Sequence, residues 1–261
     1  MRAALFALVL PILPAAAENP QQSAVPAFGE HFKQAETTGT LVLMDGKSGS
    51  LRVWNPERAA KRFIPASTFK IPNSLIGLET GAVKSVEEVL PYGGKPQWMK
   101  QWEKDADLRE AIRISSVPVY QEVARRIGQE RMAKGVASLG YGNAKTGEVV
   151  DRFWLDGPLE ISAIEQARFI ARLLADDLPL KPETMQAVRD IIPRETAGEA
   201  IIHHKTGWCT AAKPHIGWIV GWVEKDGGKH PFALNIDMEG LKDAPKRMEI
   251  LKACLETAGL L

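Results

Sequence analysis

The chain has 261 residues, of which 45% are hydrophobic and 25% charged, and its formal net charge is +1. This balance is typical of a soluble globular protein, and the near-zero charge argues against nucleic-acid partners and anionic membrane surfaces. The 22 Gly and 17 Pro show no repeat, which excludes collagen, coiled coil and wholesale disorder. We therefore expect a small enzyme that buries one sizeable core.

The first 17 residues have the pattern of a secretory signal peptide. Arg2 supplies a positive charge, residues 3–13 are apolar, and Ala15-Ala16-Ala17 has the form of an A-x-A cleavage site. The apolar run is shorter than the roughly 20 residues that a transmembrane helix needs. We therefore expect residues 1–17 to be removed, and a mature periplasmic protein without a membrane anchor.

The elements that follow alternate between strand and helix patterns. Residues 41–44 and 51–54 read as two strands around a turn-rich stretch, which predicts a β-hairpin. From 65 to about 190 the pattern is mostly helical, with helices predicted over 67–78, 119–127 and 163–175. The last of these places Ile164, Ala167, Ala171 and Leu174 on one face. Strands return over 201–206, 216–224 and 232–238, before an amphipathic helix over 241–260.

Two early strands and three late strands predict one antiparallel five-stranded sheet, flanked by helices and interrupted by an all-helical region. This is an α+β architecture in which the helices cover the sheet. We expect a single catalytic domain over 18–261, with the sheet region at about 18–60 and 195–261 and the helical region at about 61–194.

Ser67-Thr68-Phe69-Lys70 forms an S-x-x-K element at the start of a predicted helix. The three-residue spacing puts the hydroxyl and the amine on one helical face. A serine needs a neighbouring base to become a nucleophile, and a lysine is that base only where burial or modification changes its ordinary ammonium form. By itself this element is weak evidence, because a surface serine and a solvated lysine give the same pattern.

Lys205-Thr206-Gly207 stands at the end of a strand-like run and supports the first motif. Lysine and threonine side chains bind a carboxylate through charge and hydrogen bonding, and glycine leaves room for a ligand beside the strand. S-x-x-K and K-T-G occur together, with an S-D-N between them, in penicillin-recognising serine enzymes. Here the middle element is Ser115-Ser116-Val117 instead.

With these motifs, the sequence resembles the class D, oxacillinase-type serine β-lactamases over essentially its whole mature length. The matching elements are Pro65-Ala66-Ser67-Thr68-Phe69-Lys70, Ser115-Ser116-Val117, Tyr141-Gly142-Asn143, Trp154-Leu155-Asp156-Gly157 and Lys205-Thr206-Gly207. The resemblance implies a β-lactamase/transpeptidase-like fold. It also implies hydrolysis of penicillin- or cephalosporin-type antibiotics through a serine acyl-enzyme, and hence antibiotic resistance.

The resemblance also implies roles for individual residues. Ser67 would be the nucleophile, Lys70 the general base after N-carboxylation by carbon dioxide, and Ser115 the relay that carries a proton to the leaving nitrogen. The backbone N–H groups of Ser67 and Trp208 would form the oxyanion hole. The remaining assignments are Val117, Lys205, Thr206, Gly207 and Arg247 for substrate binding, Phe69, Val117, Trp154 and Leu155 for the carbamate pocket, and Tyr141 and Asn143 for the floor of the site.

The apolar residues assigned to the carbamate pocket suit that chemistry, because carbamate formation needs a neutral amine. The indole N–H of Trp154 would hold the carbamate. No cofactor beyond carbon dioxide and no metal is expected, since no Cys/His spacing resembles a zinc site. The partner would be a small β-lactam, and both a monomer and a homodimer remain open.

Several alternatives remain open in the sequence. A non-hydrolysing β-lactam sensor and a D,D-peptidase share these motifs, although sensors carry transmembrane helices that are not evident here. Trp98, Met99 and Trp102 form either a rim for substrate side chains or part of the core. Pairing between Cys209 and Cys254 cannot be decided from their spacing.

Overall fold

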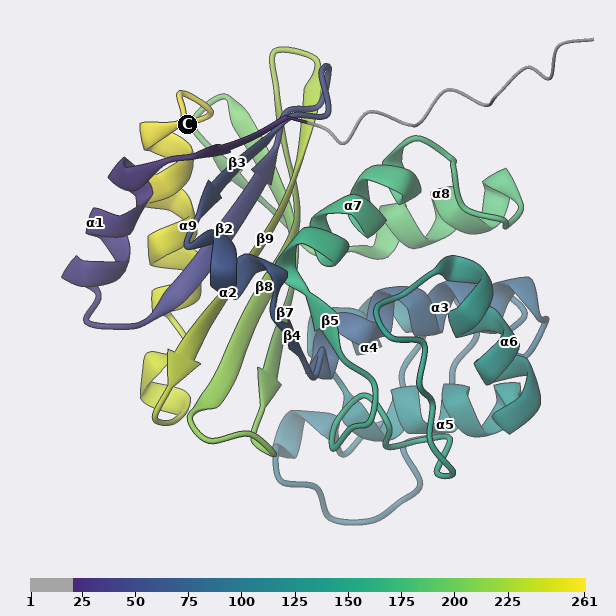
Figure 1. Ribbon diagram of the computed structural model, residues 1–261. Coiled ribbons are helices and arrows are strands. Elements are labelled where there is room, and N and C mark those ends of the chain that lie inside the picture. Colours follow the sequence, from purple (N-terminus) through teal and green to yellow (C-terminus); the bar gives the residue numbers. More distant parts are fainter. Residues whose placement is uncertain (1–20) are drawn as a thin grey trace, which may run out of the picture.

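The protein is described by a computed structural model that covers residues 21–261, so the predicted signal peptide lies outside the described residues. A sheet occupies one half of the molecule and a group of helices the other (Figure 1). The sheet contains β1 (Gln22–Ala24), β2 (Gly39–Met44), β3 (Leu51–Trp54), β6 (Arg194–Ala197), β7 (Ala200–Cys209), β8 (His215–Lys225) and β9 (Gly228–Met238). A separate short ribbon pairs β4 (Arg62–Phe63) with β5 (Ile161–Ser162).

The α-helices are α1 (Pro26–Gln34), α2 (Pro56–Ala60), α3 (Lys70–Glu79), α4 (Leu108–Arg113), α5 (Val117–Ile127), α6 (Gln129–Leu139), α7 (Ala163–Leu174), α8 (Pro182–Ile191) and α9 (Lys246–Thr257). Three short 3-10 helices, η1 (Ala66–Phe69), η2 (Lys100–Trp102) and η3 (Leu241–Asp243), complete the described elements. Helices α3 to α6 and α8 form the helical region, and α7 packs against β2, β8 and β9.

The α+β fold predicted from the sequence is confirmed, and the order of the large sheet is β1-β3-β2-β9-β8-β7-β6. The five expected strands pair antiparallel. The structure adds β1, which runs parallel to β3, and β6 at the opposite edge, so the sheet is mixed and has seven strands rather than five. Both added strands are short and largely polar, and the alternation of apolar residues that marks a half-buried strand is absent from them.

The predicted final helix over 241–260 begins later than expected. Residues Leu241–Asp243 form η3, and Pro245 then occupies the N-cap of α9. Proline lacks a backbone N–H and is tolerated at a helix start but not inside it, which is the physical reason for the break.

Two apolar cores lie on opposite faces of the sheet. One packs the sheet against the helical region and includes Trp218 and Phe69, and the other lies beneath α1 and α9 and includes Phe28 and Leu251. Cys209 belongs to the first core and Cys254 to the second, and both are buried free thiols. The sheet therefore separates the two cysteines.

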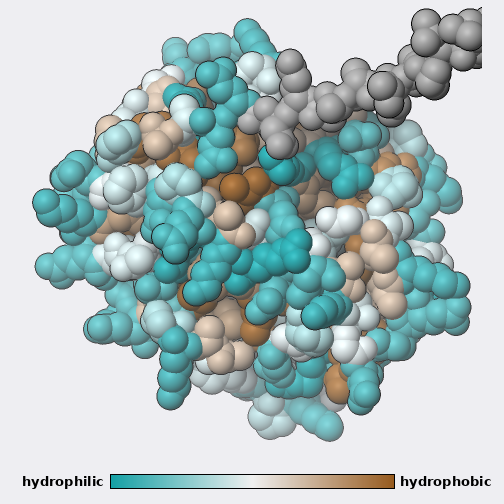
Figure 2. Space-filling model, viewed as in Figure 1, coloured by the Kyte–Doolittle hydropathy of each residue, from teal (hydrophilic) through white to brown (hydrophobic). Residues whose placement is uncertain are grey.

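The face shown in Figure 2 is predominantly hydrophilic, with hydrophobic side chains limited to small patches. No helix among the described residues has the length and apolar character required to cross a membrane. A cleft lies where one end of β7 meets η1 and the helical region.

Candidate active site

A cleft of about 870 Å³ lies between the sheet and the helical region. Segments that are far apart in the chain contribute its walls: the turn that carries Ser67, the loop before η2, the junction of α4 and α5, the end of β7 and the start of α9. It is lined by Ser67, Trp98, Met99, Gln101, Trp102, Arg113, Ile114, Ser115, Val117, Arg152, Leu155, Asp156, Thr206, Gly207, Trp208, Thr210, Leu241 and Arg247. Most of the residues that the sequence assigns to catalysis and binding therefore meet at one cleft.

Ser67 and Lys70 are in direct contact. Lys70 Nζ donates a hydrogen bond to Ser67 Oγ at 2.8 Å. Ser67 is half-buried and lines the cleft, whereas the Lys70 side chain lies fully buried beneath it at the start of α3. Burial, and to a smaller extent the neighbouring Lys205 charge, holds the pKa of Lys70 well below that of an ordinary lysine. The buried amine is thereby favoured in its neutral form.

The turn that presents Ser67 is fixed by local contacts. Ala66 has a φ of +48°, in the left-handed region that a residue with a Cβ seldom adopts. The Thr68 hydroxyl and backbone N–H both donate to the Pro65 carbonyl, at 2.8 and 3.3 Å. A Cβ at Gly207 would lie 2.8 Å from the same carbonyl oxygen. Gly207 lines the cleft, and the close approach of the nucleophile turn is a second reason for glycine here, beside the ligand access predicted from the sequence.

Ser115, which lines the cleft, contacts Lys205, which is buried behind it. Lys205 Nζ donates to Ser115 Oγ at 3.0 Å and to the Thr206 carbonyl at 2.8 Å. Ser115 precedes α5 and has a φ of +58°, another left-handed backbone position. Burial first, and then the Arg247 charge, lower the pKa of Lys205 to about 7. Lys205 therefore titrates near neutral pH.

Arg247, near the start of α9, adds a second cation beside the end of β7. Its guanidinium donates to the Gly207 carbonyl at 2.7 Å and to the Ala244 carbonyl at 3.0 Å. Burial lowers the pKa of Arg247 to about 10. Among the described residues no carboxylate offsets these two charges, since Lys205 is affected only by burial and Arg247. Such a pair suits an anionic group supplied by a ligand.

Four aromatic rings pack behind the nucleophile. Phe69 stacks on Trp154 at a centroid distance of 5.3 Å, and Phe153 and Tyr141 meet Phe69 edge-on at 5.0 and 5.7 Å. Phe69 and Trp154 are fully buried. Of the other two residues assigned to the carbamate pocket, Val117 and Leu155 lie in the wall of the cleft itself.

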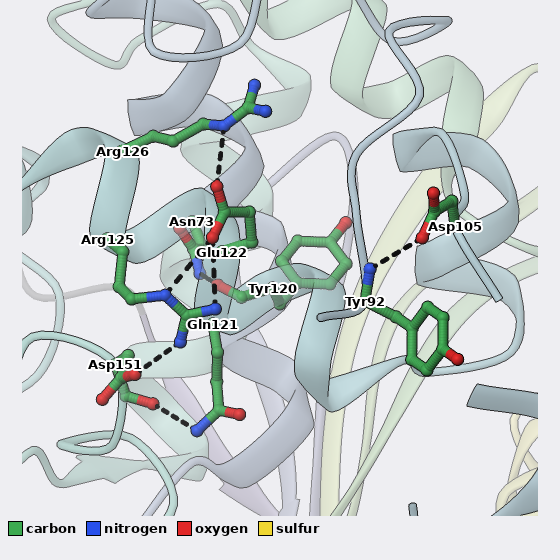
Figure 3. A network of polar contacts seen from close by, with 9 residues as sticks. All are labelled: Asn73, Tyr92, Asp105, Tyr120, Gln121, Glu122, Arg125, Arg126 and Asp151. Carbon is green, nitrogen blue, oxygen red and sulfur yellow. Dashed lines mark hydrogen bonds and ion pairs between the residues drawn. The ribbon is translucent and has the colours of Figure 1, made fainter. Parts of the chain in front are cut away.

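The loop that carries Trp154 is tied to α5, as Figure 3 shows. Gln121 Nε2 donates to the Asp151 carbonyl at 3.1 Å, and Arg125 forms an ion pair with the Asp151 carboxylate at 2.7 Å. On the neighbouring side of α5, Asn73 Nδ2 donates to the Tyr120 carbonyl at 3.1 Å and joins this helix to α3. These contacts join the loop before Trp154 to α5, and α5 to the helix that begins with Lys70.

Tyr141 and Asn143 differ in their distance from the reaction centre. The Tyr141 hydroxyl contacts Gln166 Oε1 at 3.1 Å, and Gln166 Nε2 donates to Thr68 Oγ1 at 2.8 Å. Tyr141 thus lies beneath the nucleophile turn. Asn143 instead holds its own loop, since its side chain bonds to the backbone at Pro158 and Glu160.

Gln166 is the residue of this site that sequence reasoning missed. The expected helix is present as α7, but its buried face contains Ala163, Gln166, Ala167 and Ile170, whereas Ile164 is only half-buried. The assigned face was therefore rotated by about one position. A glutamine between apolar residues at helical spacing is the signal that could have identified it, because a buried amide needs polar partners.

Trp98, Met99 and Trp102 line the cleft, so they form a rim rather than part of the core. His203 stacks on Trp222 at 4.3 Å, outside the cleft-lining set. Within residues 21–261, no group of three or more His, Cys, Asp or Glu side chains is arranged to hold a metal ion.

Comparisons with known proteins agree with this geometry. Residues 35–256 match the family described as "Penicillin binding protein transpeptidase domain". The chain is 42% identical to Beta-lactamase OXA-5 of Pseudomonas aeruginosa over 90% of this chain and 89% of the relative. It is 39% identical to Beta-lactamase OXA-48 of Klebsiella pneumoniae over 94% and 91%. The solved structure of FUS-1 (OXA-85), a class D β-lactamase from Fusobacterium nucleatum, has a TM-score of 0.88 and 41% identity, covering 92% of this chain and all of that one.

Proposed function

The chain belongs to the class D β-lactamases, and we propose that it hydrolyses penicillin- and cephalosporin-type antibiotics through an acyl-enzyme on Ser67. The observation that carries this proposal is the 2.8 Å contact between Ser67 Oγ and the buried Lys70 amine. A nucleophilic hydroxyl within hydrogen-bond reach of a neutral base is the arrangement that serine acyl transfer needs.

The cleft would orient the substrate by its two polar groups. Lys205, Thr206 and Arg247 would bind the antibiotic's carboxylate, which supplies the anion that these buried cations lack. The lactam carbonyl would then lie at Ser67, with its oxygen towards the backbone N–H groups of Ser67 and Trp208. Donors placed where negative charge develops stabilise the transition state of acyl transfer.

In acylation, Ser67 Oγ bonds to the lactam carbonyl carbon while the Lys70 side chain takes the hydroxyl proton. The lactam C–N bond breaks, and Ser115 relays the proton taken by the Lys70 side chain to the departing nitrogen, which leaves the base free for deacylation. The 3.0 Å contact from Lys205 to Ser115 Oγ supports this proton path. In deacylation the Lys70 side chain takes a proton from water, the water oxygen bonds to the acyl carbon, and that proton passes to Ser67 Oγ as the ester bond to Ser67 breaks.

The surroundings of Lys70 fit N-carboxylation. Its amine is buried and held neutral, and within residues 21–261 the only charge that affects its pKa is Lys205. Phe69 precedes Lys70 in the chain and stacks on the buried Trp154, whose indole N–H would hold the modified side chain. Carbon dioxide, when bound to the amine, would supply an anionic base that serves both acylation and deacylation. A single base for both steps requires no catalytic glutamate, and Glu148 and Glu160 are both exposed.

The proposal also includes the compartment in which the enzyme acts. Export to the periplasm through residues 1–17, followed by hydrolysis there, would give antibiotic resistance. A sensor or a D,D-peptidase built on the same motifs would also be acylated by the drug but would retain it.

Steady-state turnover of a chromogenic cephalosporin, with and without added bicarbonate, tests the proposal. We expect sustained hydrolysis that rises with bicarbonate. Ser67→Ala should abolish it, and Lys70→Met should slow acylation and block deacylation, so that an acyl-enzyme accumulates and intact-mass spectrometry detects it. Lys33→Met is the matched control, because Lys33 is an exposed lysine on α1. A single stoichiometric burst by the unmodified enzyme, with no further turnover, would refute hydrolysis in favour of a receptor or peptidase.

A further inference from the structure

We infer that Trp98 is a specificity-determining residue that stacks on an aromatic acyl side chain of the β-lactam substrate. The inference rests on the proposed hydrolysis and adds to it the chemical class of side chain that the cleft favours. Neither the S-x-x-K nor the K-T-G element contains this residue, and it lies in the loop that precedes η2.

The exposure of Trp98 is unusual for its residue type. It is 66% exposed, and only three other large hydrophobic side chains of residues 21–261 are described as exposed: Val89, Val149 and Leu241. Leu241 also lines the cleft, at 56% exposed. Two of these four side chains thus gather at the entrance of one cavity. An exposed apolar surface beside a cavity is typical of a ligand-binding position.

Trp98 belongs to a row of aromatic rings along the cleft. Its ring lies 6.1 Å from that of Trp102 and 5.7 Å from that of Trp208, with interplanar angles of 61° and 49°. Trp208 in turn meets His215 at 5.6 Å. Contacts on both sides hold the indole in place, while most of its surface remains accessible.

The neighbours of Trp98 are themselves anchored before any ligand binds. Trp102 Nε1 donates to the Ile114 carbonyl at 3.0 Å, and Gln101 Nε2 donates to the same carbonyl at 3.3 Å. Trp208 is part of β7, where its backbone pairs with Gly217. A binding surface that is already ordered loses less side-chain entropy when the ligand binds.

The position of Trp98 identifies the part of the substrate that would reach it. Lys205 and Arg247 attract the carboxylate, and Ser67 lies where the lactam carbonyl must bind. The remaining apolar lining includes Met99 and Trp98. In a penicillin the carboxylate is on the thiazolidine ring, and the acylamino side chain is on the far side of the lactam ring from it, so the acylamino group would lie against the aromatic row.

The charges near this lining do not favour an anionic side chain. Arg113 pairs with Glu110 at 2.6 Å, and Arg152 forms an ion pair with Asp156. Both arginines are therefore neutralised within the protein. Aromatic pairs contribute about 0.5–1.5 kcal/mol beyond the burial of area, which corresponds to about two- to twelvefold in rate or binding. An indole platform therefore favours an aromatic ring over an aliphatic chain.

The test compares three penicillins that share one nucleus: one with a phenylacetyl side chain, one with an aliphatic acyl chain of similar length, and 6-aminopenicillanic acid. The readout is the ratio of kcat/KM between the aromatic and the other two substrates. We expect Trp98→Ala to lower this ratio about five- to tenfold. Trp98→Leu should lower it about threefold, because it keeps apolar area but loses the flat ring, and Trp98→Phe should stay within about twofold.

Val89→Ala is the matched control, because Val89 is 64% exposed but does not line the cleft. An unchanged ratio in Trp98→Ala, with all three penicillins hydrolysed, would overturn the inference and leave the proposed function intact. Equal losses for the aromatic and aliphatic substrates in Trp98→Leu would overturn the stacking argument. Failure of the unmodified enzyme to turn over any penicillin would instead refute the proposed function.

Discussion

The lowered pKa of Lys205 predicts that activity declines at alkaline pH because substrate carboxylate binding weakens. Burial and Arg247 lower this pKa to about 7, so much of the free enzyme carries a neutral Lys205 at physiological pH. A shift of this size from 10.5 corresponds to about 5 kcal/mol in favour of the neutral amine. Because a substrate carboxylate is attracted by the ammonium form, kcat/KM should fall about tenfold for each pH unit above about 7.5.

The assay is kcat/KM for one cephalosporin between pH 6.5 and 9.5, with bicarbonate at saturation so that modification of Lys70 does not limit the rate. The control substrate is the methyl ester of the same compound. Without a carboxylate it has no need of the Lys205 charge, so its kcat/KM should lack the alkaline decline.

Arg247→Gln provides the second perturbation. Removing this cation should raise the pKa of Lys205, because the Arg247 charge is one of the two causes that lower this pKa. The pKa should remain below 10.5, because burial is the larger cause. The alkaline decline should therefore move to higher pH even though kcat/KM itself falls. An equal decline for acid and ester, or no movement in Arg247→Gln, would refute this reasoning.

Three further predictions concern neighbouring groups. Trp154→Phe keeps a ring on Phe69 but removes the indole N–H, so the bicarbonate concentration for half-maximal activity should rise about tenfold; an unchanged value would contradict the indole's role. Gln166→Leu leaves the Thr68 hydroxyl without its donor and should lower the free energy of unfolding in urea titrations by about 1–3 kcal/mol. An unchanged free energy of unfolding would contradict the role given to the hydrogen bonds of Gln166 with Thr68 and Tyr141. Between pH 7 and 8.5 the unfolded chain binds more protons than the folded one, because Lys205 has its ordinary pKa of 10.5 only when the chain is unfolded. Stability should therefore rise with pH, and Lys205→Met should lower that slope by about 1.4 kcal/mol per pH unit; equal slopes would contradict a neutral folded lysine.

The contact between Ser67 and Lys70 was predictable because it is local. A three-residue spacing at a helix start brings two side chains onto one face whatever the rest of the chain does. The contact between Lys205 and Ser115 joins residues that are 90 positions apart. No periodicity in either segment encodes it, and only the resemblance to a known family placed the two residues in one site.

The errors in the fold have equally specific causes. Strands β1 and β6 pair through backbone groups at the edges of the sheet and bury little side chain, so their sequences lack an apolar pattern. In α7 small residues such as Ala167 satisfy more than one choice of buried face. That ambiguity rotated the predicted face by one position and left Gln166 unnoticed.

The two lysines of the site show how similar burial serves two different tasks. Lys70 contacts the Ser67 hydroxyl, its amine lies 5.4 Å from the centroid of the Tyr120 ring, and burial favours the neutral amine that carbamate formation needs. Lys205 lies beside Arg247 at the cleft, so a bound carboxylate would restore its charge. The charged form of Lys205 also lowers the pKa of Lys70. Charging Lys205 when substrate binds therefore works against protonation of Lys70, which keeps the amine in the neutral form that carbamate formation needs.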